Sequence, residues 1–99
     1  ELDFLRQLPT TWDETRFIDG YPGRYVVLAR RHGNQWYVAG LNAEPSTKKL
    51  TLQLPMLAGQ TVSYYTDTKK GEPQLTQIKI DKKGQAKVEM QPNGGIILK

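Results

Sequence analysis

Residue types that commonly carry out catalysis are sparse in this 99-residue chain. His32 is the sole histidine, and it lies beside Gly33 and Asn34 in a segment typical of a hairpin turn. A general base must lie within hydrogen-bond reach of the proton that it removes, and no serine or cysteine is close to His32 in the sequence. We therefore expect His32 to be a solvent-exposed turn residue rather than a catalytic base.

Asp13 and Glu14 form an adjacent acidic pair. Glycosidases use two carboxylates placed on either side of a scissile bond. Successive side chains of a strand point to opposite faces, so this pair is not expected to flank one substrate. We expect both residues to have a structural role where a strand begins.

Metal and cofactor chemistry also lacks its usual residues. The chain has no cysteine, which excludes disulfides and thiolate zinc sites. Asp67, Glu72 and Asp81 lie in expected loops without the closely spaced oxygen ligands of a calcium loop. Gly94 and Gly95 precede a strand rather than a helix, unlike a phosphate-binding loop. We expect no catalytic, cofactor-binding or metal-binding residue in this chain, and hence no enzyme activity of its own.

Aromatic residues could form a sugar-binding surface, because exposed rings can stack on sugar rings. The candidates are Trp12, Tyr21, Tyr25, Trp36, Tyr37, Tyr64 and Tyr65. Trp36 and Tyr37 are adjacent on one expected strand, and so are Tyr64 and Tyr65 on another. One member of each pair is expected to face the core and the other an edge or interface. A carbohydrate-binding module that uses exposed aromatics remains an alternative function. It predicts exposed coplanar rings, which burial of Trp36 and Tyr64 would contradict.

The net charge of +4 arises largely from basic pairs in probable turns: Arg30-Arg31, Lys48-Lys49, Lys69-Lys70 and Lys82-Lys83. Scattered pairs of this kind usually solvate a surface or protect sheet edges. A nucleic-acid-binding module would need them on one face, and we expect no nucleic-acid partner. No apolar run approaches the ~18 residues of a membrane span, so no membrane partner is expected either.

Residues from Trp12 onward alternate with the period of two that is typical of half-buried antiparallel strands. Leu50, Leu52 and Leu54, for example, alternate with Thr51 and Gln53. Residues 25–29 and 36–41 are apolar on both faces, which indicates central strands. Short turn motifs separate roughly eight strands, and no helical segment lies between them. The sequence predicts an all-β fold, an antiparallel β-sandwich of about eight strands.

The first eight residues differ from the rest because their apolar spacing is helical. Phe4 and Leu8 are four residues apart, and Pro9 ends the segment. No N-cap residue precedes the segment, so it indicates a short N-terminal helical stub, the end of a longer helix. The sequence begins with Glu1 rather than Met, which also predicts a piece of a longer polypeptide. The apolar face of the stub predicts a contact with another part of the protein.

Several motifs, at residues 8–15, 29–31, 36–40 and 92–96, together resemble the C-terminal domain of glycoside hydrolase family 97. That family contains α-glucosidases and α-galactosidases, mainly from Bacteroidetes-like bacteria. The most specific motif is Leu-Pro-Thr-Thr-Trp-Asp-Glu-Thr at residues 8–15. The resemblance covers nearly the whole chain in order and continues at residues 29–31, 36–40, Asn42, Tyr64, Tyr65, Asp67 and 92–96.

This resemblance implies a non-catalytic accessory domain whose parent chain is an α-glucosidase or α-galactosidase. Residues 1–11 would be the end of the preceding barrel helix and a linker, and residues 12–99 the C-terminal β-sandwich domain. The catalytic carboxylates, and calcium where it occurs in the family, would belong to domains outside this chain. The domain itself would contain no cofactor.

The implied role is to pack on the catalytic barrel and stabilise it, with another subunit as a further partner in oligomerisation. Phe4, Leu5, Leu8 and Trp12 are the candidate interdomain contacts. The resemblance also implies a periplasmic or secreted protein. It does not indicate which glycoside the parent chain cleaves.

Overall fold

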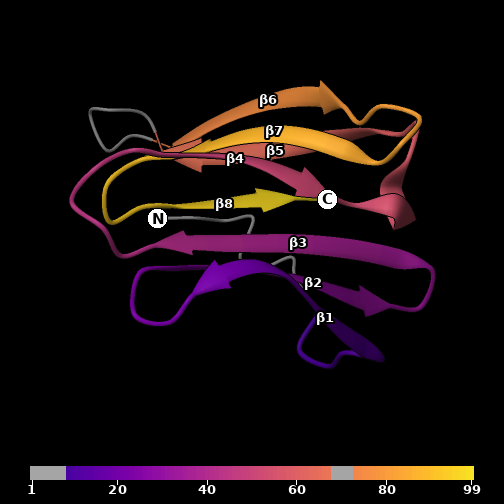
Figure 1. Ribbon diagram of the computed structural model, residues 1–99. Coiled ribbons are helices and arrows are strands. Elements are labelled where there is room, and N and C mark those ends of the chain that lie inside the picture. Colours follow the sequence, from indigo (N-terminus) through magenta and orange to yellow (C-terminus); the bar gives the residue numbers. More distant parts are fainter. Residues whose placement is uncertain (1–8, 68–72) are drawn as a thin grey trace.

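The computed structural model describes residues 9–67 and 73–99 (Figure 1). In this part of the chain, every pair of neighbouring strands is antiparallel. The strands are β1 (Glu14–Tyr21), β2 (Tyr25–His32), β3 (Gln35–Asn42), β4 (Lys48–Gln53), β5 (Thr61–Asp67), β6 (Pro73–Lys79), β7 (Gln85–Met90) and β8 (Gly95–Leu98). The predicted all-β fold of about eight strands is confirmed. The predicted helical stub lies outside the described residues.

Two sheets form the sandwich. The larger sheet has six strands in the order β1-β2-β3-β8-β5-β6, and the smaller one pairs β4 with β7. The strand β8 lies between β3 and β5, so it joins the β1–β3 meander to the β5–β6 hairpin (Figure 1). The β4–β7 pair packs over one face of the larger sheet, and we call this the closed face.

The core lies between the closed face and the β4–β7 pair. Its most deeply buried large side chains are Val27, Val38, Leu52, Leu54, Ile80, Met90 and Leu98. Fully burying one such side chain stabilises the fold by about 1.5–3 kcal/mol. Packing is tight at Gly40 of β3, where an added Cβ would lie 3.0 Å from both Met90 Sδ and Ile96 Cγ1. Glycine at this position lets the two layers approach each other closely.

Strand alternation agrees with the predicted pattern. Leu52 and Leu54 are buried, whereas Thr51 and Gln53 are exposed. The predicted central strands are β2 and β3, each of which has a neighbour on both sides. The expected turn at residues 32–34 joins them, with Gly33 at a φ of 60°. The predicted alternation and the predicted turn are both confirmed. Each depends on residues that are neighbours in the sequence rather than on distant contacts.

One short element departs from the expectation of strands alone after Trp12. Pro55–Leu57 form a single 3-10 turn, η1, after β4. Proline suits the first helical position because it lacks an N–H that would have no partner there. The turn buries Leu57 and packs its backbone on Gly84, whose φ is 84°. No helix among the described residues is long and apolar enough to cross a membrane.

Candidate functional site

His32 lies at the exposed end of the β2–β3 hairpin. Its Nδ1 atom is 3.0 Å from the Thr11 carbonyl oxygen, so the ring holds the segment before β1 against the hairpin. The described residues place neither a serine nor a carboxylate in hydrogen-bond contact with this ring. This arrangement agrees with the prediction of a turn residue and gives the histidine a structural contact.

Asp13 and Glu14 converge on Arg31 of β2. Arg31 Nε donates to Glu14 Oε1 at 3.3 Å, and Arg31 Nη1 lies 3.9 Å from Asp13 Oδ2. Asp13 Oδ2 also accepts a hydrogen bond from the Gly33 amide at 2.8 Å. These contacts agree with the expected structural role at the start of a strand. The expectation that strand alternation separates the two side chains was wrong, because Asp13 precedes β1 and both side chains can turn toward one arginine.

The pKa of Glu14 is lowered from its ordinary value, first by the hydrogen bond from Arg16 and then by that from Arg31. Burial opposes this shift. The carboxylate is therefore kept ionised and engaged, which is the opposite of what a general acid needs. Among residues 9–67 and 73–99, no group of three His, Cys, Asp or Glu residues is arranged to hold a metal ion.

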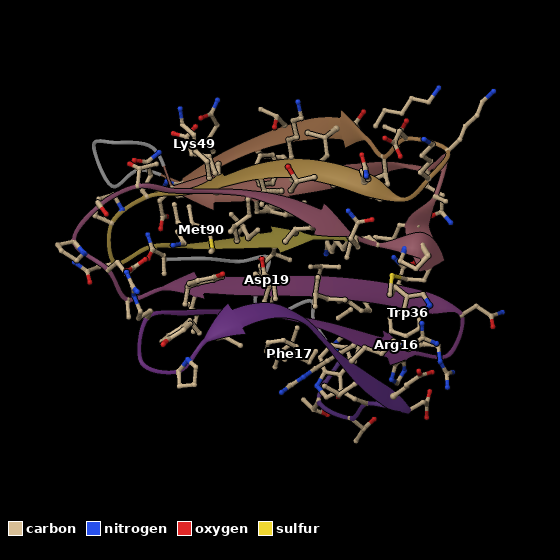
Figure 2. The ribbon with its side chains drawn as sticks, in the orientation of Figure 1. Arg16, Phe17, Asp19, Trp36, Lys49 and Met90 are labelled. Atoms are coloured by element: carbon tan, nitrogen blue, oxygen red, sulfur yellow. The ribbon has the colours of Figure 1, made fainter. Side chains whose placement is uncertain are left out.

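Trp36 and Tyr64, the residues on which the sugar-platform alternative depends, both pack against the core. The guanidinium of Arg16 lies 4.9 Å from the Trp36 ring centroid and covers that ring (Figure 2). The Tyr64 hydroxyl donates to the Glu89 carbonyl and accepts from the Glu89 amide, each at 3.0 Å. These two rings therefore form no exposed platform.

The second face of the six-stranded sheet carries the most distinctive surface. We call it the open face, because β4 and β7 lie on the other side of the sheet. One row of residues in register crosses all six strands on this face: Phe17, Leu28, Ala39, Ile97, Tyr65 and Leu75. Phe17 is 67% exposed and Leu75 is 59% exposed at the two ends of the row. Figure 2 shows Phe17 on the side of the molecule away from β4 and β7.

Part of this row lies in a hollow around Trp12. The hollow has a volume of about 250 Å³ and is lined by Trp12, Val26, Leu28, Arg30, Tyr37, Ala39, Leu41 and Ile97. The rings of Trp12 and Tyr37 meet edge to face, with centroids 5.4 Å apart. A second hollow, of about 500 Å³, adjoins it at Val26 and Leu41 and includes Phe17 and Tyr21.

Soluble monomers rarely expose apolar surfaces that cross a whole sheet, and such surfaces usually mark interfaces. Strands β2 and β3 carried a sequence signal for this face, because they are apolar on both sides. That signal was interpreted only as a sign of central strands. Most of the open-face residues were therefore not predicted as contact residues.

Of the predicted contact residues, Trp12 lies on the open face, where its ring lines the first hollow. Phe4, Leu5 and Leu8 lie outside the described residues. Phe17 and Leu41, which are 67% and 65% exposed, are open-face candidates that the sequence did not single out. An exposed leucine or phenylalanine cannot be distinguished from a buried one by alternation alone.

Comparison with known proteins relates this chain to a family. Residues 11–99 match the family described as "Glycosyl-hydrolase 97 C-terminal, oligomerisation". The chain is 34% identical to a retaining alpha-galactosidase of Bacteroides thetaiotaomicron, over 97% of this chain and 15% of that protein. It is 41% identical to a probable retaining alpha-galactosidase of Streptomyces bingchenggensis, over 57% of this chain and 8% of that protein.

Solved structures share the fold. A beta-arabinopyranosidase superposes with a TM-score of 0.92 at 56% identity, over 97% of this chain and 15% of that one. A glycoside hydrolase family 97 enzyme from Pseudoalteromonas sp. strain K8 has a TM-score of 0.78 at 18% identity, a likeness of fold alone, and the match covers 97% of this chain and 17% of that one. This chain thus spans about 15% of the length of such relatives. It belongs to the family of glycoside hydrolase 97 C-terminal domains.

Proposed function

We propose that this chain is the accessory domain of a glycoside hydrolase and that its open face packs on the catalytic barrel of that enzyme. The apolar row across all six strands carries this proposal, because it is the larger sheet's only face without a second layer from the described residues. Burying such a surface would stabilise both domains, at about 25 cal/mol for each Å² of apolar area removed from water.

The activity of the longer protein is part of the same proposal. An α-galactoside or a β-arabinopyranoside is the favoured substrate, since these are the activities named for the relatives that resemble the chain along 97% of its length. An α-glucoside is the third candidate. Assays of the longer protein with the p-nitrophenyl derivatives of all three sugars would discriminate among them. Hydrolysis of none of them would contradict the proposed activity.

A charge placed on the open face tests the docking role. Leu75 is 59% exposed at one end of the apolar row and lines neither hollow, so Leu75→Glu should be tolerated by the 99-residue chain alone. In the longer protein the same change should lower the melting temperature, because a carboxylate would be buried against apolar surface. Thr51→Glu, on the exposed outer side of β4, is the matched control and should have the same small effect in both. Equal effects of Leu75→Glu in both would contradict docking by this face.

Oligomerisation would follow if part of the open face remains uncovered after docking. The second hollow around Phe17 and Tyr21 is the part farther from Trp12 and is the surface that we assign to another subunit. Sedimentation of the longer protein tests this assignment. A Phe17→Glu variant that sediments as smaller species than the unaltered protein would support it, and unchanged sedimentation would contradict it.

The carbohydrate-binding alternative is tested separately by isothermal titration of the chain with a malto-oligosaccharide and an α-galactoside. We expect no heat of binding, because Trp36 and Tyr64 pack on the core. Saturable binding that disappears in a Tyr21→Ala variant would instead favour a sugar-capturing module.

A further inference from the structure

Arg30 differs from the other arginines that the structure describes. Arg16 and Arg24 each contact a glutamate, at 2.6 Å and 2.7 Å, and Arg31 contacts Asp13 and Glu14. Arg30 forms no ion pair within residues 9–67 and 73–99. Its Nε atom is buried and has no hydrogen-bond partner.

The position of Arg30 makes this unusual. It lies on β2, in register with Thr15 of β1 and Tyr37 of β3, so its side chain belongs to the open face. Its guanidinium lies 5.7 Å from the Trp12 ring centroid, and its side chain lines the apolar hollow. The arginine is therefore held by an aromatic ring, which covers one face of the guanidinium but accepts no in-plane hydrogen bond.

A buried N–H without a partner is costly, and native structures rarely keep one without a reason. The two Nη groups are not among the buried atoms that lack a partner, and they lie side by side in a geometry that matches the two oxygens of a carboxylate. Described residues lining the hollow include none with a carboxylate. The described part of the sheet therefore supplies no carboxylate to this guanidinium.

We infer that Arg30 binds an aspartate or glutamate side chain of the catalytic region when that region packs on the open face. This inference rests on the proposed docking function and adds a polar contact to the apolar docking surface. The apolar row would supply buried apolar area but would not determine how the two domains are oriented. A bidentate Arg–carboxylate pair in the hollow would fix one orientation of the two domains.

A second copy of the chain fits this role less well. Two copies that met through the same hollow would bring apolar lining against apolar lining, and that lining would offer Arg30 no carboxylate. The catalytic region has the surface for this role, because about 85% of the length of the alpha-galactosidase relative lies outside the matched domain. Trp12, the ring on which Arg30 rests, is also near the end of the chain that leads to that region in the proposed enzyme.

The test compares Arg30→Met in two contexts, the 99-residue chain and the longer protein. Methionine keeps an apolar stem in the hollow but removes the guanidinium. In the chain alone the melting temperature should be unchanged or slightly raised, because a buried donor without a partner is removed. In the longer protein the melting temperature should fall, because the partner carboxylate would be left buried and unpaired.

Arg30→Lys sharpens the readout, since lysine keeps the charge but lacks the planar pair of donors. It should recover only part of the loss in the longer protein. Arg16→Met is the matched control: Arg16 is ion-paired on the other side of the sheet, so its effect should be the same in both contexts. Circular dichroism of the isolated variants shows whether each one folds.

Equal shifts for Arg30→Met in the two contexts would overturn the inference. If Leu75→Glu still destabilised only the longer protein, docking by the open face would stand and only the carboxylate partner would fail. If neither variant discriminated between the contexts, the docking proposal would fail as well. A selective loss with Arg30→Met supports both.

Discussion

The two faces of the six-stranded sheet are built from the same strands but are completed differently. On the closed face, β4 and β7 cover Val27, Val38 and Leu98, which are fully buried. On the open face, the neighbouring residue Leu28 is half-buried and Ala39 is exposed. Both faces are apolar, so composition alone does not separate the core of this domain from its interface. What separates them is whether the chain itself supplies the second layer.

The polar groups of the two faces show the same difference. Asn42, 2% exposed on the closed face, donates to the carbonyls of Ser46, Met90 and Gln91 and accepts from the Glu44 amide. Arg30, on the open face, has a buried donor with no partner. The closed face is complete within the described part of the chain, whereas the open face has no second layer from the described residues.

Truncation of one leucine on each face should give the largest contrast. Leu52→Ala removes a buried core side chain and should lower the free energy of unfolding of the chain by about 2–5 kcal/mol. Leu41→Ala, at a side chain that is 65% exposed, should change it by about 0.5 kcal/mol or less. Urea unfolding of the 99-residue chain measures both. Similar losses would mean that the open face is already packed without a partner.

The second-largest loss in the free energy of unfolding is expected when the side-chain amide of Asn42 is removed. Asn42→Ala leaves three carbonyls and one amide without their side-chain partner, and should cost about 1–3 kcal/mol. Asn42→Asp should not restore stability, because a carboxylate has no N–H for the carbonyls. Gln53→Ala, at an exposed position of β4, serves as the control and should be near neutral. If Asn42→Ala left the free energy of unfolding nearly unchanged, water would replace the amide, and this end of the closed face would be open to solvent.

Acidification should have the smallest effect. Hydrogen bonds from Arg24 and then from Lys48 lower the pKa of Glu44 below its ordinary value of 4.5. A lowered pKa in the folded state stabilises the fold above the unfolded value, and that contribution is lost as the pH falls through the folded value. Stability should therefore decline as the pH falls below about 4.5, and Glu44→Gln should flatten this part of the profile. An unchanged profile in the variant would assign the decline to other carboxylates, such as Glu14.

Much of the fold could be predicted because its signals are local. Alternation at Leu52 and Leu54 and the turn at Gly33 each depend on neighbouring residues, and both predictions were confirmed. The placement of β8 between β3 and β5 could not be predicted in this way. Residues 96–98 indicate a strand that is apolar on both sides, but they do not indicate which strands pair with it.

The candidate site was predictable only in part, for a related reason. Trp12 stood out as an aromatic residue next to the apolar N-terminal segment. Arg30 was grouped with Arg31 as one of several surface pairs, because adjacent arginines look alike in a sequence. The structure separates them: Arg31 is held by Asp13 and Glu14, whereas Arg30 turns into an apolar hollow.

The central position of β8 has a consequence for how the chain is synthesised. Among the described strands, the β1–β3 meander and the β5–β6 hairpin are joined into one sheet only by β8 and the residues that flank it. Until those residues leave the ribosome, one edge of β3 and one edge of β5 have no partner in the sheet. Contacts between such distant segments form slowly, and unpaired strand edges favour aggregation. Loss of this short final strand would therefore be expected to harm the yield of folded protein more than the loss of four residues suggests.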